Sequence, residues 1–192
     1  MQTLDHHLNL TDPFADIQST TRLHLTKHGC GAYTFEDGSA LTRFVSEHIP
    51  MRIIELGTAL GYTACCMAEG SQHAHIDTIE GDAEHVKLAR EQIALHGLSS
   101  RITVYHGKFE HVLQTLHAGY NMAFFDGYAP SMDIILQIRN LLVENGILIC
   151  SNLQLGRGTE SRRLDAELAN HVRWQKLTSI ESGQTAILIK RS

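Results

Sequence analysis

The chain has 192 residues, of which 43% are hydrophobic and 19% are charged, and this mixture suits one globular domain with a continuous apolar core. The formal net charge of −5 argues against a general binder of nucleic acid or anionic membranes, because such binding depends on clustered lysine and arginine. No apolar run is long enough to cross a bilayer, and the polar N-terminus lacks a secretory signal pattern. We therefore expect a cytoplasmic protein that binds neither DNA nor membranes.

Residues 1 to about 33 show weak periodicity, and we expect one irregular helix followed by a connecting segment. A helix is predicted over residues 39–48, where Pro50 ends it. From Arg52 onward, short apolar runs alternate with helical patterns. The expected strands cover residues 52–57, 75–80, 101–106, 121–126 and 146–151. The expected helices begin at Tyr62, after the cap Asp82, at Phe109 and after Pro130, and Asn145-Gly146 ends the last of them.

The C-terminal part of the chain changes pattern. After a helix that begins near Thr159, two strand-like runs over 174–181 and 184–191 are joined by Ser182-Gly183, so short a joint that it predicts an antiparallel hairpin at the sheet edge. Strands separated by helices predict a parallel sheet covered on both faces. The predicted fold class is α/β: a Rossmann-like, doubly wound, mostly parallel seven-stranded sheet that ends in an antiparallel C-terminal hairpin.

Four cysteines and thirteen histidines raise the question of metal sites. The cysteines form no C-x-x-C pair, and Cys65, Cys66 and Cys150 are expected to be small core residues. His73 and His75 form an H-x-H, but no second ligand pair stands at zinc spacing. We expect nearly all histidines, including His85, to be solvated.

Ligands of doubly wound sheets bind at the carboxyl ends of the strands, so residues that follow the expected strands are the candidates for chemistry. The first segment is ELGTALGYT, in which Gly57 and Gly61 permit a tight turn. Ala59 and Tyr62 stand where a dinucleotide fingerprint has its second and third glycines, and there is no P-loop lysine. The loop therefore suits a nucleoside ligand without a pyrophosphate.

Further candidates end the other strands. Glu80 ends the second strand, where a carboxylate can accept hydrogen bonds from both ribose hydroxyls. Gly107 follows the third strand and lets the chain pass close to a flat base. Phe109 has two possible roles, either beside the ring of that base or as a residue of the hydrophobic core. Asp126 ends the fourth strand in FFDGYAP, and Asn152 follows the fifth, as a functional amide or a simple turn residue.

From residue 33 to residue 192 the chain resembles the S-adenosylmethionine-dependent O-methyltransferases of the catechol and caffeoyl-coenzyme A type. ELGTALGYT resembles the first glycine motif of that family, and FFDGYAP resembles its fourth strand with a cofactor- and metal-binding aspartate. The resemblance implies an enzyme that transfers the methyl group of S-adenosyl-L-methionine to a hydroxyl of a small aromatic or related acceptor. It implies a single methyltransferase domain over 1–192, with an N-terminal helical segment over 1–33 and a cofactor-binding core over 34–192, and a homodimer.

The resemblance also implies site residues. The implied cofactor-binding residues are Tyr33, Glu55, Gly57, Thr58, Tyr62, Thr63 and Asp126, with Glu80, Gly107, Lys108, Phe109 and Glu110 around the adenosine. The implied catalytic residues are Asp126, Tyr128 and Asn152, and Asp126 and Asn152 are the implied ligands of a magnesium ion. Ser151 stands where the family has a second aspartate, and Ala129 where the catechol enzymes have a lysine. The loss of one anionic ligand should weaken a magnesium site.

Three alternatives stay open. Ser151 and Ala129 motivate a non-catalytic or degenerate protein that binds S-adenosylmethionine without methyl transfer. A methyltransferase that acts on hydroxylated tRNA is the second alternative. A nicotinamide-dependent oxidoreductase is the third, although the glycine spacing speaks against it. Methyl transfer to a nitrogen is disfavoured, because GYAP follows the fourth strand in place of an Asn/Asp-Pro-Pro-aromatic motif.

Overall fold

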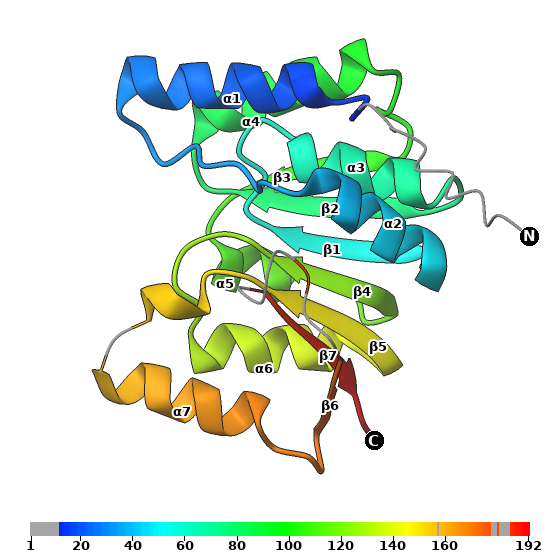
Figure 1. Cartoon of the computed structure of the whole chain (residues 1–192), viewed down its shortest axis with the longest axis vertical. Coiled ribbons are helices and arrows are strands. Elements are labelled where there is room, and N and C mark those ends of the chain that lie inside the picture. Colours follow the sequence, from blue (N-terminus) through cyan, green and yellow to red (C-terminus); the bar gives the residue numbers. More distant parts are fainter. Residues whose placement is uncertain (1–11, 157, 178–179, 181–184) are drawn as a thin grey trace, which may run out of the picture.

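The computed structural model describes residues 12–156, 158–177, 180 and 185–192, which form a seven-stranded sheet between two layers of helices (Figure 1). The strand order is β3-β2-β1-β4-β5-β7-β6. The strands are β1 (Arg52–Leu56), β2 (His75–Glu80), β3 (Ile102–His106), β4 (Tyr120–Phe125), β5 (Leu142–Cys150), β6 (Trp174–Lys176) and β7 (Ala186–Lys190). The first five pair in parallel, and β7 runs antiparallel to both β5 and β6. The predicted fold class is confirmed.

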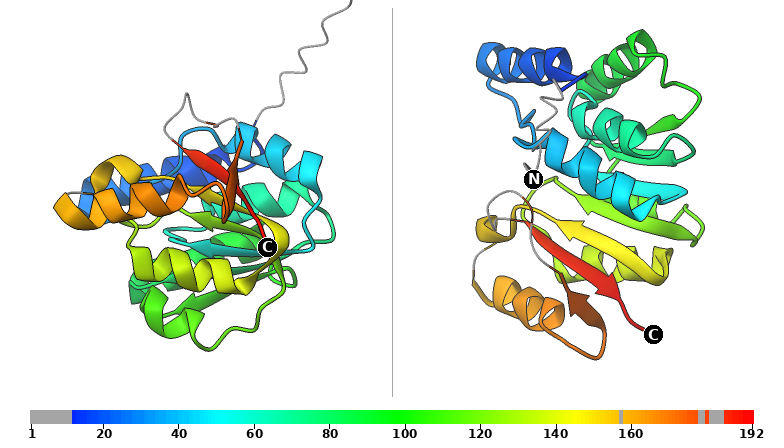
Figure 2. Two further views of the ribbon diagram at one scale, coloured as in Figure 1. Left: turned by 90° about the horizontal axis from the view of Figure 1, so that it is seen from below. Right: turned by 45° about the vertical axis from the view of Figure 1, so that its right-hand side comes forward.

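Helices cover both faces of the sheet, as the two views of Figure 2 show. The helices are α1 (Ala15–His28), α2 (Gly38–His48), α3 (Tyr62–Gly70), α4 (Ala83–Leu95), α5 (Phe109–Leu113), α6 (Met132–Leu141) and α7 (Gly158–Leu168). In one apolar core, the helices α1, α2, α3 and α4 pack on one face of the sheet. In a second apolar core, α5, α6 and α7 pack on the other face. Adjacent residues of β1 serve the two cores, since Ile53 packs in the first and Ile54 in the second.

The helix starts follow capping chemistry. Asp82 caps α4 by accepting hydrogen bonds from the backbone amides of Glu84 and His85, at 2.8 and 3.1 Å, so the expected cap is confirmed. Helix α1 has no side-chain cap, and its buried residues are Ile17 and Thr21. It therefore rests on the first core through a narrow contact.

Two expectations were wrong. The helix after Pro130 ends at Leu141 and not at Asn145-Gly146, because Leu142 already pairs with Tyr120 in the sheet. Asn145, at φ 61°, lies within β5, where the pairing register with β4 shifts. His85 is buried at 5% exposure, and not solvated, because α4 turns it inward toward α1.

Three further points from the sequence concern the cysteines, the joint of the terminal hairpin and membrane-spanning helices. Cys65, Cys66 and Cys150 are buried core residues, as expected. The joint Ser182-Gly183 lies outside the described residues. Within the part of the chain that the structure describes, no helix has both the length and the apolar character to cross a membrane.

Candidate active site

The turn after β1 depends on a glycine. Gly57 has φ +101°, a conformation that favours glycine, and its amide donates to the carbonyl of Ile79 at 3.0 Å. A Cβ atom on Gly57 would lie 2.8 Å from the carbonyl oxygen of Asp126 and 2.9 Å from Cα of Gly127. The absence of a side chain therefore lets the ends of β1 and β4 meet, and this contact forms the floor of the site.

Glu80 is held at the end of β2 by two backbone amides. Its Oε2 accepts a hydrogen bond from the amide of Ala59 at 2.9 Å, and its Oε1 accepts one from the amide of Asp82 at 3.0 Å. These bonds fix the carboxylate between the glycine turn and the start of α4. The side chain is 14% exposed, so the carboxylate keeps access to a ligand while its orientation is set in advance.

Glu55 lies beneath the turn, fully buried, and is absent from the described residues that line the cavity. Its two carboxylate oxygens accept hydrogen bonds from the hydroxyls of Thr63 and Thr78, and Thr78 lies 2.6 Å from the hydroxyl of Thr58. Burial raises the pKa of Glu55 to about 8, although the bonds from Thr63 and Thr78 lower it. Glu55 thus braces the turn from below.

A cavity of about 370 Å³ opens above this floor, at the carboxyl ends of the central strands. Its lining residues are Thr21, Gly31, Tyr33, Thr34, Phe35, Gly57, Thr58, Ala59, Leu60, Tyr62, Thr63, Glu80, Phe109, Asp126, Gly127, Tyr128, Ala129 and Leu155. Two carboxylates, Glu80 and Asp126, face the cavity, whereas its described lining contains no lysine or arginine. The electrostatics therefore favour a cationic or neutral ligand over a pyrophosphate.

Aromatic rings line one side of the cavity and a neighbouring hollow. The rings of Phe109 and Tyr128 stack at 5.2 Å with an interplanar angle of 14°, and the Tyr128 hydroxyl donates to Glu110 at 3.1 Å. Burial, together with this bond, raises the pKa of Tyr128 to about 12. The hollow beyond the rings is lined by Gly107, Lys108, Phe109, Glu110 and Tyr128. These residues provide a flat surface of the kind that a nucleobase contacts.

Asp126 is surrounded by hydrogen-bond donors. Its Oδ1 accepts from the Ser151 hydroxyl at 2.5 Å and from Nδ2 of Asn152 at 3.2 Å, and the same Nδ2 lies 3.2 Å from the carbonyl oxygen of Gly127. Magnesium requires oxygen ligands and relies on carboxylates. Here one carboxylate is present, and its neighbours Ser151 and Asn152 carry no charge. The donor set of Asp126, Ser151 and Asn152 therefore does not fit a magnesium ion.

The structure brings most of the expected site residues together. The cavity wall contains Tyr33, Gly57, Thr58, Tyr62, Thr63, Glu80, Phe109, Asp126 and Tyr128, and the adjoining hollow contains Gly107, Lys108 and Glu110. Glu55 and Asn152 lie behind the wall, bonded to residues that form it. The sequence reasoning missed Thr21, Gly31, Thr34, Phe35 and Leu155, which come from segments without a recognisable motif.

The methyltransferase domain family matches residues 54–153, which is just over half of the chain and includes the glycine turn, Glu80 and Asp126. The chain belongs to this methyltransferase family. Catechol O-methyltransferase of Bos taurus is 25% identical over 163 residues, covering 80% of this chain and 60% of that protein. Catechol O-methyltransferase of Niastella koreensis is 31% identical over 105 residues, covering 52% of this chain and 48% of that protein. The resemblance predicted from the sequence is confirmed.

Solved methyltransferases share the fold. The O-methyltransferase of Bacillus cereus, in complex with SAH, superposes with a TM-score of 0.77 at 18% identity, covering 92% of this chain and 91% of the other. The O-methyltransferase TomG of Streptomyces achromogenes, in complex with SAM, also gives 0.77 at 18% identity, with coverage of 92% and 90%. This methyltransferase chain spans from 46% to 60% of the length of the curated relatives it matches.

Proposed function

We propose that this domain binds S-adenosylmethionine in the cavity and transfers the methyl group to a hydroxyl of a small aromatic or related acceptor, with no magnesium ion at Asp126. One observation carries the proposal: a glycine turn and a carboxylate fixed by two backbone amides meet at adjoining strand ends, in a cavity whose described lining has no basic residue. A cationic sulfonium nucleoside matches this charge, whereas a nicotinamide dinucleotide with its pyrophosphate does not.

Each part of the cavity has a role in this proposal. Glu80 accepts hydrogen bonds from the ribose hydroxyls, and the stacked rings of Phe109 and Tyr128 border the base. The bound cofactor supplies an electrophilic methyl group on its sulfonium sulfur. The acceptor binds at the mouth, where Tyr33, Tyr128 and Leu155 are exposed at 74%, 48% and 52%. These side chains favour a flat, largely apolar acceptor, and alignment of its oxygen with the methyl group supplies most of the acceleration.

Methyl transfer to a hydroxyl requires a group that accepts the hydroxyl proton, and of the three catalytic candidates one can do so. Tyr128 is protonated at neutral pH and donates to Glu110, so it is a poor base. Asn152 has an amide, which does not take up protons near neutral pH. Asp126 is the remaining candidate; a carboxylate is intrinsically a much weaker base than a phenolate, and Oδ1 of Asp126 already accepts hydrogen bonds from Ser151 and Asn152. We therefore propose acidic phenols as preferred acceptors.

Calorimetric titration with S-adenosylhomocysteine tests the cofactor site. We expect Glu80→Ala to weaken binding by about 1–3 kcal/mol, the cost of a lost charge-assisted hydrogen-bond pair. Glu91→Ala is the matched control, because Glu91 is exposed on α4 away from the cavity lining, and it should bind as the wild type does. Unchanged affinity in Glu80→Ala would exclude the ribose role. Added magnesium should leave the wild-type affinity unaltered.

A second candidate function is cofactor binding without catalysis. It is favoured by Ser151, which stands where the family has a second aspartate and whose hydroxyl donates a hydrogen bond to the carboxylate of Asp126. Methyl transfer to any catechol, hydroxycinnamate or hydroxylated tRNA in an assay panel would exclude it and identify the acceptor class. The cytoplasmic location and the homodimer expected from the sequence stay predictions, as do the boundaries at residues 33 and 34.

A further inference from the structure

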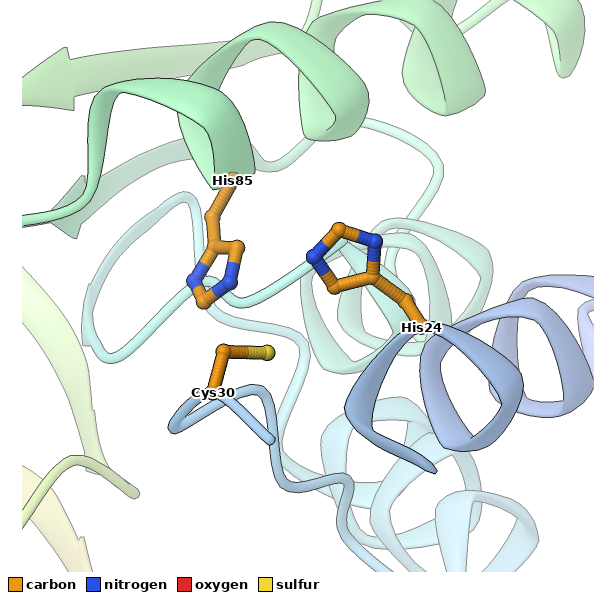
Figure 3. A group of neighbouring side chains, drawn as sticks. All are labelled: His24, Cys30 and His85. Atoms are coloured by element: carbon orange, nitrogen blue, oxygen red, sulfur yellow. The ribbon is translucent and has the colours of Figure 1, made fainter. Parts of the chain in front are cut away.

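Three side chains with metal-binding atoms meet outside the cavity, between α1 and α4 (Figure 3). His24 lies in the last part of α1, Cys30 follows the glycine that ends this helix, and His85 lies in the first turn of α4. One ligand atom from each lies within 4.8 Å of the other two. Among the described residues this is the one group of three or more such side chains that meets this criterion.

The donor chemistry favours zinc over magnesium or calcium. Two imidazoles and a thiol supply nitrogen and sulfur ligands, which suit zinc, whereas magnesium and calcium prefer oxygen. Cys30 is half-buried, and the other three cysteines are buried in the core. His24 is half-buried as well, and its ring lies against that of His85, with the two ring centroids 5.3 Å apart.

The surroundings of the three side chains leave room for a fourth ligand. Nδ1 of His85 lies 3.9 Å from Oε1 of Glu80, and Figure 3 shows one ring nitrogen of His85 turned toward the other two side chains. The cluster lines a hollow of about 490 Å³, in which His28, Glu84 or a water molecule can fill the fourth position.

The position of the cluster gives a bound ion a structural consequence. Helix α1 buries few residues against the core, and the segment that follows Cys30 supplies Gly31, Tyr33, Thr34 and Phe35 to the cavity wall. An ion held by both α1 and α4 would fix the start of this segment. We propose that His24, Cys30 and His85 form a zinc site that ties α1 to α4 beside the methyltransferase cavity.

Metal binding by the full chain, stripped of metal and without cofactor, tests the proposal. We expect one zinc ion per chain by calorimetry, with proton release from the thiol. Cobalt(II) in its place should give a thiolate-to-cobalt charge-transfer band and the strong visible bands of a tetrahedral site. Cys30→Ser should lose the charge-transfer band, and His24→Gln and His85→Gln should each lose at least about tenfold in zinc affinity.

Controls separate this site from adventitious binding and from the proposed function. His117→Gln alters an exposed histidine remote from the cluster and should bind zinc as the wild type does. In the wild-type protein, zinc but not magnesium should slow the reaction of Cys30 with a thiol reagent. This measurement does not depend on whether any variant folds. Equal zinc affinity in wild type and Cys30→Ser, or cobalt spectra without a thiolate band, would overturn the proposal. Neither result depends on S-adenosylhomocysteine binding, which is measured separately.

Discussion

Two structural features require glycine at position 57: its backbone conformation and the close approach of neighbouring backbone atoms. Its φ of +101° is strained for any residue with a Cβ, and that atom would also meet the backbone of Asp126 and Gly127 within 3 Å. We expect Gly57→Ala to push β4 from β1 and to weaken S-adenosylhomocysteine binding about 10- to 100-fold, because a small displacement of a wall disrupts a fitted site. Calorimetry measures the loss.

Gly97→Ala is the matched control for backbone strain alone. Gly97 has φ +70°, but a Cβ there would meet no atom within 4 Å. The substitution should lower stability by about 1 kcal/mol through strain and leave cofactor affinity unchanged. If both alanine variants bind equally well, the close approach of the two strands is not what shapes the site.

Ser151 can be tested by restoring the residue that the family places there. Ser151→Asp would set a second carboxylate beside Asp126 in a buried position, so we expect the unfolding free energy without metal to fall by about 1–3 kcal/mol. Magnesium should then bind between the carboxylates and raise the melting temperature of this variant but not of the wild type. Thermal unfolding with and without magnesium measures both effects. A wild-type protein that magnesium stabilises as strongly as the variant would contradict the metal-free reading of this site.

Among the elements, the terminal hairpin is held by a polar contact in an apolar setting. Trp174 in β6 is 1% exposed, and its indole Nε1 donates to Glu167 of α7 at 3.2 Å, while Arg173 pairs with the same carboxylate at 2.8 Å. We expect Glu167→Ala to destabilise the fold by about 1–3 kcal/mol, because the buried indole N–H loses its partner.

Chemical unfolding followed by fluorescence measures this effect, since Trp174 is the single tryptophan of the chain. Asp165→Ala on the same helix is the control, because Asp165 is exposed, and it should change stability by less than about 0.5 kcal/mol. Equal stability of the two variants would show that water replaces Glu167 at the indole.

The elements were predictable where a local pattern and the tertiary structure agree. The five parallel strands are short apolar runs because both faces of each strand are covered, and the cap Asp82 acts within its own turn. The end of α6 could not be found this way. Asn145-Gly146 is a typical helix stop, but pairing of Leu142 with Tyr120 ends the helix earlier, and this contact is set by the sheet.

At the scale of the whole molecule, the site residues also divide into those that a local sequence pattern predicts and those that only the tertiary structure places. Gly57, Glu80 and Asp126 could be predicted because each lies at or just after the carboxyl end of a strand, and these ends gather at one edge of a parallel sheet. Phe35 and Leu155 reach the cavity from segments whose paths no local pattern specifies. The cluster of His24, Cys30 and His85 was missed for a related reason, since His24 and Cys30 lie far from His85 in the sequence and only the fold brings the three side chains together.

Glu55 links the site to the stability of the whole chain. Burial, and then the charges of Asp126 and Glu80, hold its pKa at about 8 in the folded state, against 4.5 as its ordinary value. Below pH 4.5 both folded and unfolded chains carry the proton. Between these values the unfolded chain loses it while the folded chain retains it, so stability falls as pH rises, by up to about 1.4 kcal/mol per pH unit.

Glu55→Gln keeps the shape and the hydrogen bonds but cannot titrate, so it should lack this fall. We expect the stability of the wild type relative to Glu55→Gln to decline from pH 4.5 to pH 8 and to level off above it, as measured by urea unfolding with Trp174 fluorescence. Glu69→Gln, at an exposed position of α3, should follow the wild type throughout. Parallel curves for wild type and Glu55→Gln would mean that Glu55 is charged in the folded protein. Its carboxylate would then add negative charge beneath the turn, where the proposed sulfonium ligand binds.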